Sequence, residues 1–449
     1  MEPQIQPKSD LGRLSEALES GTKQQVERML GTLHPAEMAL LLESMPPDKR
    51  SLVWELVAPQ DEGDILIELN DEVRARLVLD MDTDEVIAAT EGMELDDLAD
   101  FVADLPEALT QQVIRSLDQR DRERLRDVLS FQEDSAGGLM NPNTISVRPN
   151  VSLDVVLHYL RRLGSIPDNT GTLFVVDRND KYLGALNIAK LVTQNPQKLV
   201  TDVMNEDTEA FVAETHAAEV AKSFQTHDLV AAAVIDDKGF LLGQITVDDI
   251  VDFIQEQADH DILSMAGLDE EDDMFAPVVT SSQRRAIWLG VNLATAFLAA
   301  AIIGIFKPTL DKVVILAVLM PVVASMGGIA GSQTLTLMIR GLALGRVHDS
   351  NARWLLRKEL AVALLNGLAW ALVVALVTVL FFSTWKVGAI IAAALAINLL
   401  AAALAGFAIP LLLRKLNIDP ALAGSVVLTT ITDVIGFVAF LGLGTYFLT

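Results

Sequence analysis

The 449-residue sequence contains no cysteine. This absence excludes a disulfide framework and thiolate metal sites, and it is compatible with a reducing compartment. The first ten residues, Met1–Asp10, are polar and lack the apolar core, flanked by basic residues, of a secretory signal. We therefore expect no cleavable signal and an amino end that stays in the cytoplasm.

Basic residues are scarce in the first part of the chain. Residues 1–280 contain 22 Lys and Arg against 56 Asp and Glu, whereas residues 281–449 contain 12 against 5. Such an acidic surface repels nucleic acid phosphates, so we expect no nucleic acid partner, and divalent cations are the charged partners that fit. A merely solvated acidic face is the alternative interpretation.

Charged residues almost vanish from five long stretches after Arg285: Trp288–Phe306, Val313–Ile339, Leu360–Thr384, Val387–Leu413 and Ala421–Thr449. Each provides the ~20 residues that a helix needs to cross a ~30 Å hydrocarbon core. Nine Lys and Arg lie in the connections on one side and three in those on the other. By the positive-inside preference, the amino end is inside and the carboxyl end outside. We predict a five-helix transmembrane domain over residues 285–449, lying in the lipid bilayer of the cytoplasmic (inner) cell membrane.

Asp433 is the only Asp or Glu in these stretches and lies near the middle of the fifth. Inserting Asp at such a position costs roughly 2.5–3.5 kcal/mol. Helical spacing puts Ser425, Thr429 and Gly436 on the same face, with Thr432 at its edge. We predict that this stripe faces a pore or a helix interface. The alternative is a protonated Asp433 that only hydrogen-bonds between helices.

The second stretch concentrates residues that weaken helices. They are Pro321, Gly327, Gly328 and Gly331, followed by the polar Gln333. We expect a helix broken at the glycines, whose freed carbonyls line the pore, because such carbonyls are tolerated at membrane depth only in protein or along a watery cavity. Close helix packing at the glycines is a compatible alternative.

Two amides, Asn366 and Asn398, lie in the third and fourth stretches. They suit the same cavity or, alternatively, hydrogen bonds between helices. Together with Asp433, the carbonyl and hydroxyl oxygens form a hard-ligand set that suits Mg²⁺, Ca²⁺ or Mn²⁺ better than Zn²⁺ or Cu⁺. Two copies of Asp433 at a dimer axis would double the charge.

An internal repeat occupies residues 140–258, as copies of about 140–199 and 204–258. The segment that begins at Val175 recurs without a gap 59 residues later, at Val234. Each copy predicts strand, turn, strand and helix, with a further helix before them. This α/β pair resembles tandem cystathionine-β-synthase (CBS) domains. Thr246-x-x-Asp249 matches the motif that often holds a nucleotide ribose there, whereas Asn187–Lys190 in the first copy does not, so a nucleotide cofactor is supported by one copy only.

Short amphipathic segments with Asp, Asn or Pro at their starts fill residues 12–132. These are helix-capping residues, so we predict an all-α, superhelical N domain. Most of its carboxylates belong to caps and solvated faces. Asp97 is the candidate metal ligand among them.

Asp249, Asp252, Glu256 and Asp259 recur at spacings of three and four before the membrane domain, and Asp261 and the run Asp269–Asp273 follow. Like charges at these spacings oppose helix formation unless cations bridge them. We therefore predict a cation-sensing connecting helix over residues 259–284. A plain acidic linker is the alternative.

The order of these parts and several motifs resemble the MgtE family of magnesium transporters over nearly the whole chain. The motifs are Asp134–Met140, Pro321 to Gln333, Ile339–Gly341, Asp419–Ala421 and Thr429–Asp433. The resemblance implies a homodimeric Mg²⁺ channel whose pore ion is held by Asp433 and carbonyls of the second span. It also implies a connecting (plug) helix that closes the pore when Mg²⁺ bridges the cytoplasmic carboxylates, so Mg²⁺ is both transported and regulatory.

The sequence departs from the family pattern at several positions. Ile329 stands where the family usually has Asn, and Lys307 replaces an acidic residue at the end of the first span. Further acidic positions are occupied by His216, Ala218, Gln257 and His260. We expect sensing with fewer ions or lower affinity.

Other functions fit the sequence less well. An intramembrane aspartyl protease needs two membrane Asp residues, and a metalloprotease needs His pairs, whereas the membrane half has only His348. We expect no enzyme. A less selective Mn²⁺ or Co²⁺ transporter and a CBS-containing scaffold without transport stay as alternatives.

Overall fold

The computed structural model describes residues 23–164, 166, 170–268, 273–344, 346–416 and 418–449. Residues 12–22 of the predicted N domain and Asp269–Asp272 of the acidic run lie outside this set. The chain divides into two compact units. Their described parts are residues 23–257 with 273–277, and residues 258–268 with 278–449.

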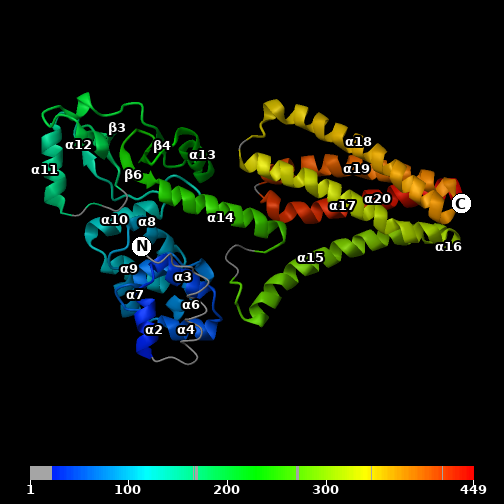
Figure 1. Ribbon diagram of the computed structural model, residues 1–449, viewed down its shortest axis with the longest axis horizontal. Helices are drawn as coiled ribbons and strands as arrows, with labels where there is room; N and C mark the ends of the chain where they lie inside the picture. The colour runs from blue at the N-terminus through cyan, green and yellow to red at the C-terminus, as the bar shows by residue number, and fades with distance from the viewer. Residues whose placement is uncertain (1–22, 165, 167–169, 269–272, 345, 417) are drawn as a thin grey trace, which may run out of the picture. The chain divides into compact units, whose positions relative to one another are not determined.

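The first unit begins with short helices, which confirm the predicted all-α N domain (Figure 1). Within residues 23–128 they are α2 (Lys23–Leu30), α3 (Pro35–Glu43), α4 (Pro47–Trp54), α5 (Glu62–Ile67), α6 (Asp71–Asp80), α7 (Thr83–Ala89), α8 (Leu95–Ala103), α9 (Glu107–Ser116) and α10 (Gln119–Val128). Polar side chains start several of them: Asn70 accepts from the Val73 N–H, and Asp82 accepts from those of Asp84 and Glu85. Such caps satisfy N–H groups that have no partner within the helix.

The repeat forms two three-stranded sheets with the same topology. The first copy contains β1 (Ser146–Val147), α11 (Leu153–Leu163), β2 (Thr172–Val176), β3 (Tyr182–Asn187) and α12 (Ile188–Thr193). The second contains a 3₁₀ turn η1 (Val200–Asp202), β4 (Ala210–Val212), α13 (Ala217–His227), β5 (Ala231–Ile235), β6 (Leu241–Thr246) and α14 (Val247–Met265). In each sheet the first pair of strands is parallel and the second antiparallel. Val175 pairs with Gly184 and Val234 with Gly243, so the strand register repeats the 59-residue offset of the sequence.

The connecting helix differs from the prediction. Among the residues of 259–284 that the structure describes there is no separate helix, because α14 continues from the end of β6 to Met265 and the next helix begins at Val278. No proline or glycine interrupts residues 247–265, so nothing in the backbone stops the helix there. Gly267 follows with φ +71°, a left-handed conformation that glycine adopts readily after a helix end.

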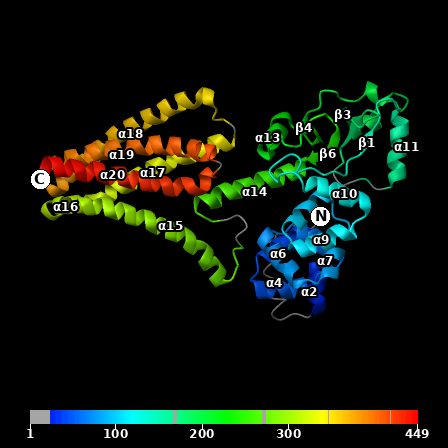
Figure 2. The same cartoon turned by 180° about the vertical axis from the view of Figure 1, so that it is seen from behind.

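Five described helices are long and apolar enough to cross a membrane, as predicted. They are α15 (Val278–Ile305), α17 (Val314–Ala343), α18 (Asp349–Phe382), α19 (Trp385–Lys415) and α20 (Pro420–Leu448), and the short α16 (Lys307–Lys312) joins the first two. Helix α19 packs against α17, α18 and α20, and it runs alongside α18 in both views (Figures 1 and 2).

Candidate functional site

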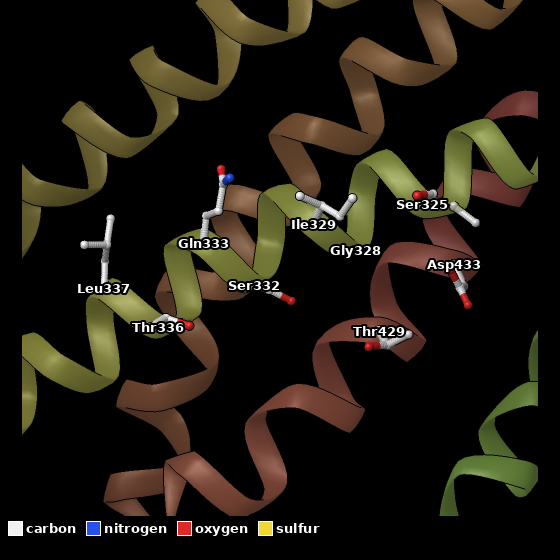
Figure 3. Close-up of a pocket in the computed structure, with 10 residues that line it drawn as sticks. Ser325, Gly328, Ile329, Ser332, Gln333, Thr336, Leu337, Thr429 and Asp433 are labelled. Atoms are coloured by element: carbon white, nitrogen blue, oxygen red, sulfur yellow. The ribbon is translucent and has the colours of Figure 1, made fainter. Parts of the chain in front are cut away.

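A groove with a volume of about 970 Å³ lies on α17 and α20 (Figure 3). Its lining residues are Ala324, Ser325, Gly328, Ile329, Ser332, Gln333, Thr336, Leu337, Thr429 and Asp433. In the figure Ser332 points from α17 to the side of α20, whereas Ile329 and Gln333 point to the opposite side. The groove therefore gathers hydroxyl oxygens and one carboxylate along helices that are otherwise apolar.

Asp433 lies near the middle of α20 and is partly exposed in the groove. Thr429, one turn earlier, is exposed in the same groove, and its hydroxyl donates to the carbonyl of Ser425 at 2.8 Å. Thr432 is fully buried, and its hydroxyl donates to the carbonyl of Thr429 at 3.0 Å. Of the polar residues predicted to line a pore from this helix, the structure places Thr429 in the groove and Thr432 outside it.

The three glycines of α17 have different surroundings. A Cβ atom built on Gly327 would lie 2.2 Å from Nδ2 of Asn398, and one on Gly331 would lie 2.8 Å from Cδ1 of Leu428. Gly328 lines the groove, and a Cβ there would meet no atom within 4 Å. Two glycines therefore permit close helix packing, and one leaves the groove open.

The expectation of a broken second helix is wrong, because α17 is continuous from Val314 to Ala343 with Pro321 inside it. Each glycine weakens a helix by only about 1 kcal/mol relative to alanine, a cost that packing against α19 and α20 can offset. The fully buried Asn398 contributes to this packing, since its Nδ2 donates to the carbonyl of Val323 at 2.9 Å. Asn366 is exposed on α18 and does not line the groove.

Ser325, Ser332 and Thr336 line the groove, although the sequence analysis did not select them. Together with Gly328 they recur at spacings of three and four, so extending the helical face from that glycine would have identified them. A buried carboxylate was missed as well. Glu359 of α18 is 6% exposed, with Oε1 2.9 Å from Nζ of Lys358 and Oε2 3.5 Å from the hydroxyl of Thr334.

A second set of acidic residues lies in the first unit, between α8 and α14. We call it the acidic cluster: Asp96, Asp97 and Asp100 on α8, and Asp249, Asp252 and Glu256 on α14. Burial, followed by the charges of Asp97, Asp249 and Glu94, raises the pKa of Asp96 to about 8. The two helices therefore present like charges to each other.

The same causes act on other members of the acidic cluster. Burial, then Glu94, Glu68, Asp248 and Asp252, raises the pKa of Asp97 to about 6. Loss of hydration, then the charges of Asp97 and Glu256, raises the pKa of Asp100. Within the described residues no three carboxylate or histidine side chains are placed to hold one metal ion.

Asp249 is tied to the residue that precedes α14. The backbone N–H and the hydroxyl of Thr246 both donate to Oδ2 of Asp249, at 2.8 and 2.9 Å. Burial raises the pKa of Asp249 to about 6 against the lowering effect of these hydrogen bonds. The two residues predicted to hold a ribose thus cap α14 together.

The last residues of α14 belong to the second unit. Asp259 is exposed there, and burial raises the pKa of Asp261, with His260 lowering it and Asp419 raising it. Nε2 of His260 lies 3.4 Å from Oδ2 of Asp419, and Asp419 caps α20 by accepting from the N–H groups of Ala421 and Leu422. The structure therefore brings Asp249, Asp252 and Glu256 together with Asp97 in the first unit, whereas Asp259 and Asp261 belong to the second unit.

Comparisons with known proteins match each part of the chain. The family MgtE, described as a divalent cation transporter, matches residues 320–443, and the MgtE intracellular N domain matches residues 33–134. CBS domains match residues 136–194 and 200–256.

Whole-length relatives and a solved structure agree with these matches. The chain is 29% identical to the magnesium transporter MgtE of Thermus thermophilus over 95% of this chain and 96% of the relative. It is 25% identical to that of Bacillus subtilis, over 96% of each chain. A crystal structure of the cytosolic domain of the Mg²⁺ channel MgtE in complex with ATP matches with a TM-score of 0.50 and 28% identity, covering 54% of this chain and 99% of that one.

Proposed function

The chain belongs to the MgtE family of magnesium transporters, which are not enzymes, and we propose that Mg²⁺ crosses the membrane along the groove lined by α17 and α20. It is a multi-pass membrane protein with a cytosolic N-terminal domain. The observation that carries the proposal is the position of Asp433, a carboxylate in a groove with Ser325, Ser332 and Thr429. Mg²⁺ dehydrates reluctantly and commonly binds through one or two carboxylates while keeping several waters.

Asp433 attracts the ion, and the hydroxyl groups of the groove accept hydrogen bonds from its water shell. The backbone of Gly328 contributes little bulk, which leaves room for a hydrated ion. A groove that opened to lipid would expose the Asp433 charge at high cost. We therefore propose a homodimer in which a second copy closes the groove and adds its own carboxylate.

Cytoplasmic Mg²⁺ closes this pathway in our proposal. The acidic cluster supplies the carboxylate oxygens that Mg²⁺ prefers, and burial, followed by the like charges that face each other, raises the pKa of its members. Mg²⁺ bound between α8 and α14 relieves this repulsion and draws the two helices together. When the cytoplasmic Mg²⁺ concentration falls, the helices separate and the pathway opens. Mg²⁺ uptake therefore increases when the cytoplasm contains little Mg²⁺.

A nucleotide is a further candidate ligand, because a similar cytosolic domain binds ATP. Thr246 and Asp249 would hold the ribose, after exchanging the hydrogen bonds that they make with each other.

Ion flux into proteoliposomes tests the pore. We expect Asp433→Ala to lower Mg²⁺ flux at least about tenfold, a loss equivalent to ~1.4 kcal/mol. Asp311→Asn, which removes an exposed carboxylate from α16, is the matched control and should keep the native flux. Undiminished flux in Asp433→Ala would reject the pore assignment, and no flux in the native protein would favour the scaffold. Competition by Mn²⁺ and Co²⁺ at equal concentration decides between a selective and a less selective transporter.

A further inference from the structure

Arg50 of α4 is a buried cation in the N domain, with 1% of its side chain exposed. Its Nε donates to the carbonyl of Leu42 at 2.9 Å, and its Nη2 donates to that of Met45 at 3.0 Å. Its Nη1 donates to Oδ2 of Asp273 at 2.9 Å. Asp273 is 223 residues away in the chain and its side chain is 2% exposed.

Further hydrogen bonds hold the segment that contains Asp273. Its backbone N–H donates to Oε2 of Glu72 on α6 at 2.7 Å. Its Oδ1 accepts from the Phe275 N–H at 2.8 Å, and its carbonyl accepts from the Ala276 N–H at 3.0 Å. Residues 273–276 are therefore a folded turn that is bound to the N domain by its first residue.

A buried ion pair contributes little net stability, since apolar side chains of similar size do as well or better. Removing one partner is nevertheless costly, because the other charge stays buried without compensation. The pair therefore specifies which residue of the segment docks: a carboxylate must enter the site beside Arg50.

The docked segment lies between α14 and the first membrane helix in the chain. Asp273 follows α14, whose acidic residues face α8, and precedes α15, which begins at Val278. Five residues of fully extended chain span at most about 17 Å. The chain between the docked Asp273 and the start of the first membrane helix is therefore short.

We propose that Arg50 and Asp273 form a clamp by which the N domain holds the segment that enters α15, so that movement of the N domain is passed directly to the first membrane helix. This inference rests on the proposed closure of the pathway by cytoplasmic Mg²⁺. When Mg²⁺ leaves the acidic cluster, α8 moves away from α14. The clamp then moves residues 273–277 with the N domain, by a route that does not pass along α14.

Hydrogen exchange on the full chain in lipid nanodiscs tests the clamp itself. We expect the amides of Phe275 and Ala276 to exchange at least about tenfold faster in Asp273→Ala, because the substitution removes the acceptor of the Phe275 amide and leaves the carbonyl that accepts from Ala276 without its anchor. This variant keeps the bonds from Arg50 to Leu42 and Met45 but leaves the buried guanidinium without a counter-charge, so we expect the amides of α3 and α4 to lose some protection, and less than those of Phe275 and Ala276. Asp273→Asn keeps the side-chain oxygen that accepts from Phe275 but removes the charge. It therefore distinguishes the effect of losing the ion pair from the effect of losing the hydrogen bond within the turn. Arg115→Gln, an exposed cation on α9, is the control.

Flux in proteoliposomes tests the coupling. In Asp273→Ala we expect the internal Mg²⁺ concentration that halves the flux to shift at least about threefold, with unchanged flux at low Mg²⁺. Native exchange rates at Phe275 and Ala276 in both Asp273 variants would overturn the clamp. Faster exchange with a native inhibition curve would overturn the coupling. A native protein that internal Mg²⁺ does not inhibit would overturn the proposed closure and the coupling with it, and the exchange data would still decide whether the clamp exists.

Discussion

Nε2 of His260 lies 3.4 Å from Oδ2 of Asp419, and this contact joins the end of α14 to the residue that caps α20, the helix of Asp433. Two carboxylates at this place would repel each other and need a cation between them. The histidine makes the contact without one.

His260→Glu should therefore make the contact depend on Mg²⁺. Without Mg²⁺ we expect the amides of residues 258–265 to exchange about tenfold faster than in the native protein, since like charges now face each other. Millimolar Mg²⁺ should restore protection in the variant by bridging the two carboxylates. His260→Gln, which cannot bridge through a cation in this way, is the control, and equal exchange in His260→Glu with and without Mg²⁺ would contradict the argument.

The glycines of α17 provide a matched pair of variants. Gly327→Ala should destabilise the membrane domain by roughly 1–3 kcal/mol, because its methyl group overlaps the amide of Asn398. Gly328→Ala meets no atom and should be neutral, or more stable by up to about 1 kcal/mol, because alanine favours helix. Unfolding of the detergent-solubilised protein measures both. Equal stability of the two variants would show that the close approach of α17 and α19 is not as described.

The length of the uncharged stretches predicts the five long helices, the recurrence of one segment predicts the repeat, and helical spacing predicts the common face of Thr429 and Asp433. Each of these features is contained in the local sequence. Spacing puts Thr429 on the face of Asp433 and Thr432 at its edge, and only packing against neighbouring helices decides that Thr432 is buried. The different surroundings of Gly327 and Gly328 also depend on packing, since adjacent residues of a helix face different neighbouring helices and the sequence does not say which neighbours these are.

Other features depend on contacts between distant segments. Glu359 lies one residue before the predicted apolar stretch Leu360–Thr384, so the sequence pattern does not include it among the membrane carboxylates. Helix α18 itself begins earlier, at Asp349. The docking of Asp273 beside Arg50 joins residues 223 positions apart, and in the sequence Asp273 is simply the last of five acidic residues. Local composition gives no sign that one of the five is buried.

Mg²⁺ binding to the acidic cluster should release protons. Asp96, with its pKa raised to about 8, is largely protonated at pH 7, and a bound cation displaces that proton. Asp100, with its pKa raised to about 7, contributes as well, so we expect release of about one to two protons per chain when Mg²⁺ is added to lightly buffered protein at pH 7. A pH indicator measures it, with NaCl of equal ionic strength as the control. Asp96→Asn should reduce the release to the part that comes from Asp100, and a native-sized release in that variant would exclude Asp96 as a source.

The same pKa shifts set the pH dependence of the metal-free protein. Burial in the folded state raises the pKa values of Asp96, Asp97 and Asp249 above 3.8, the ordinary value for aspartate. Between pH 3.8 and about 6 to 8 the folded state therefore binds more protons than the unfolded state, so stability falls as the pH rises through this range. Protection of α8 amides in the presence of EDTA, corrected for intrinsic exchange, should be greater at pH 5.5 than at pH 8. Mg²⁺ should reduce this difference.

Ile329 and Leu337 allow a test of the groove, because both line it and each is 56% exposed. Ile329→Asn adds an amide near Gly328 that can accept a hydrogen bond from the water shell of the ion. We expect the Mg²⁺ concentration for half-maximal flux to fall about threefold, the effect of a modest hydrogen bond. Leu337→Asn adds the same group farther along α17 and should change this concentration little. Equal effects of the two substitutions would argue that only the polarity of the groove matters.

Gly267 has a left-handed backbone conformation, and a Cβ atom built on it would lie 1.9 Å from the indole ring of Trp288 on α15. A methyl group at residue 267 is thus tolerated only if the ring of Trp288 or the backbone around residue 267 moves. The glycine permits the packed arrangement, and alanine in its place would combine a strained backbone with an overlap against this ring. This residue therefore sets how closely the connecting segment and the first membrane helix can approach.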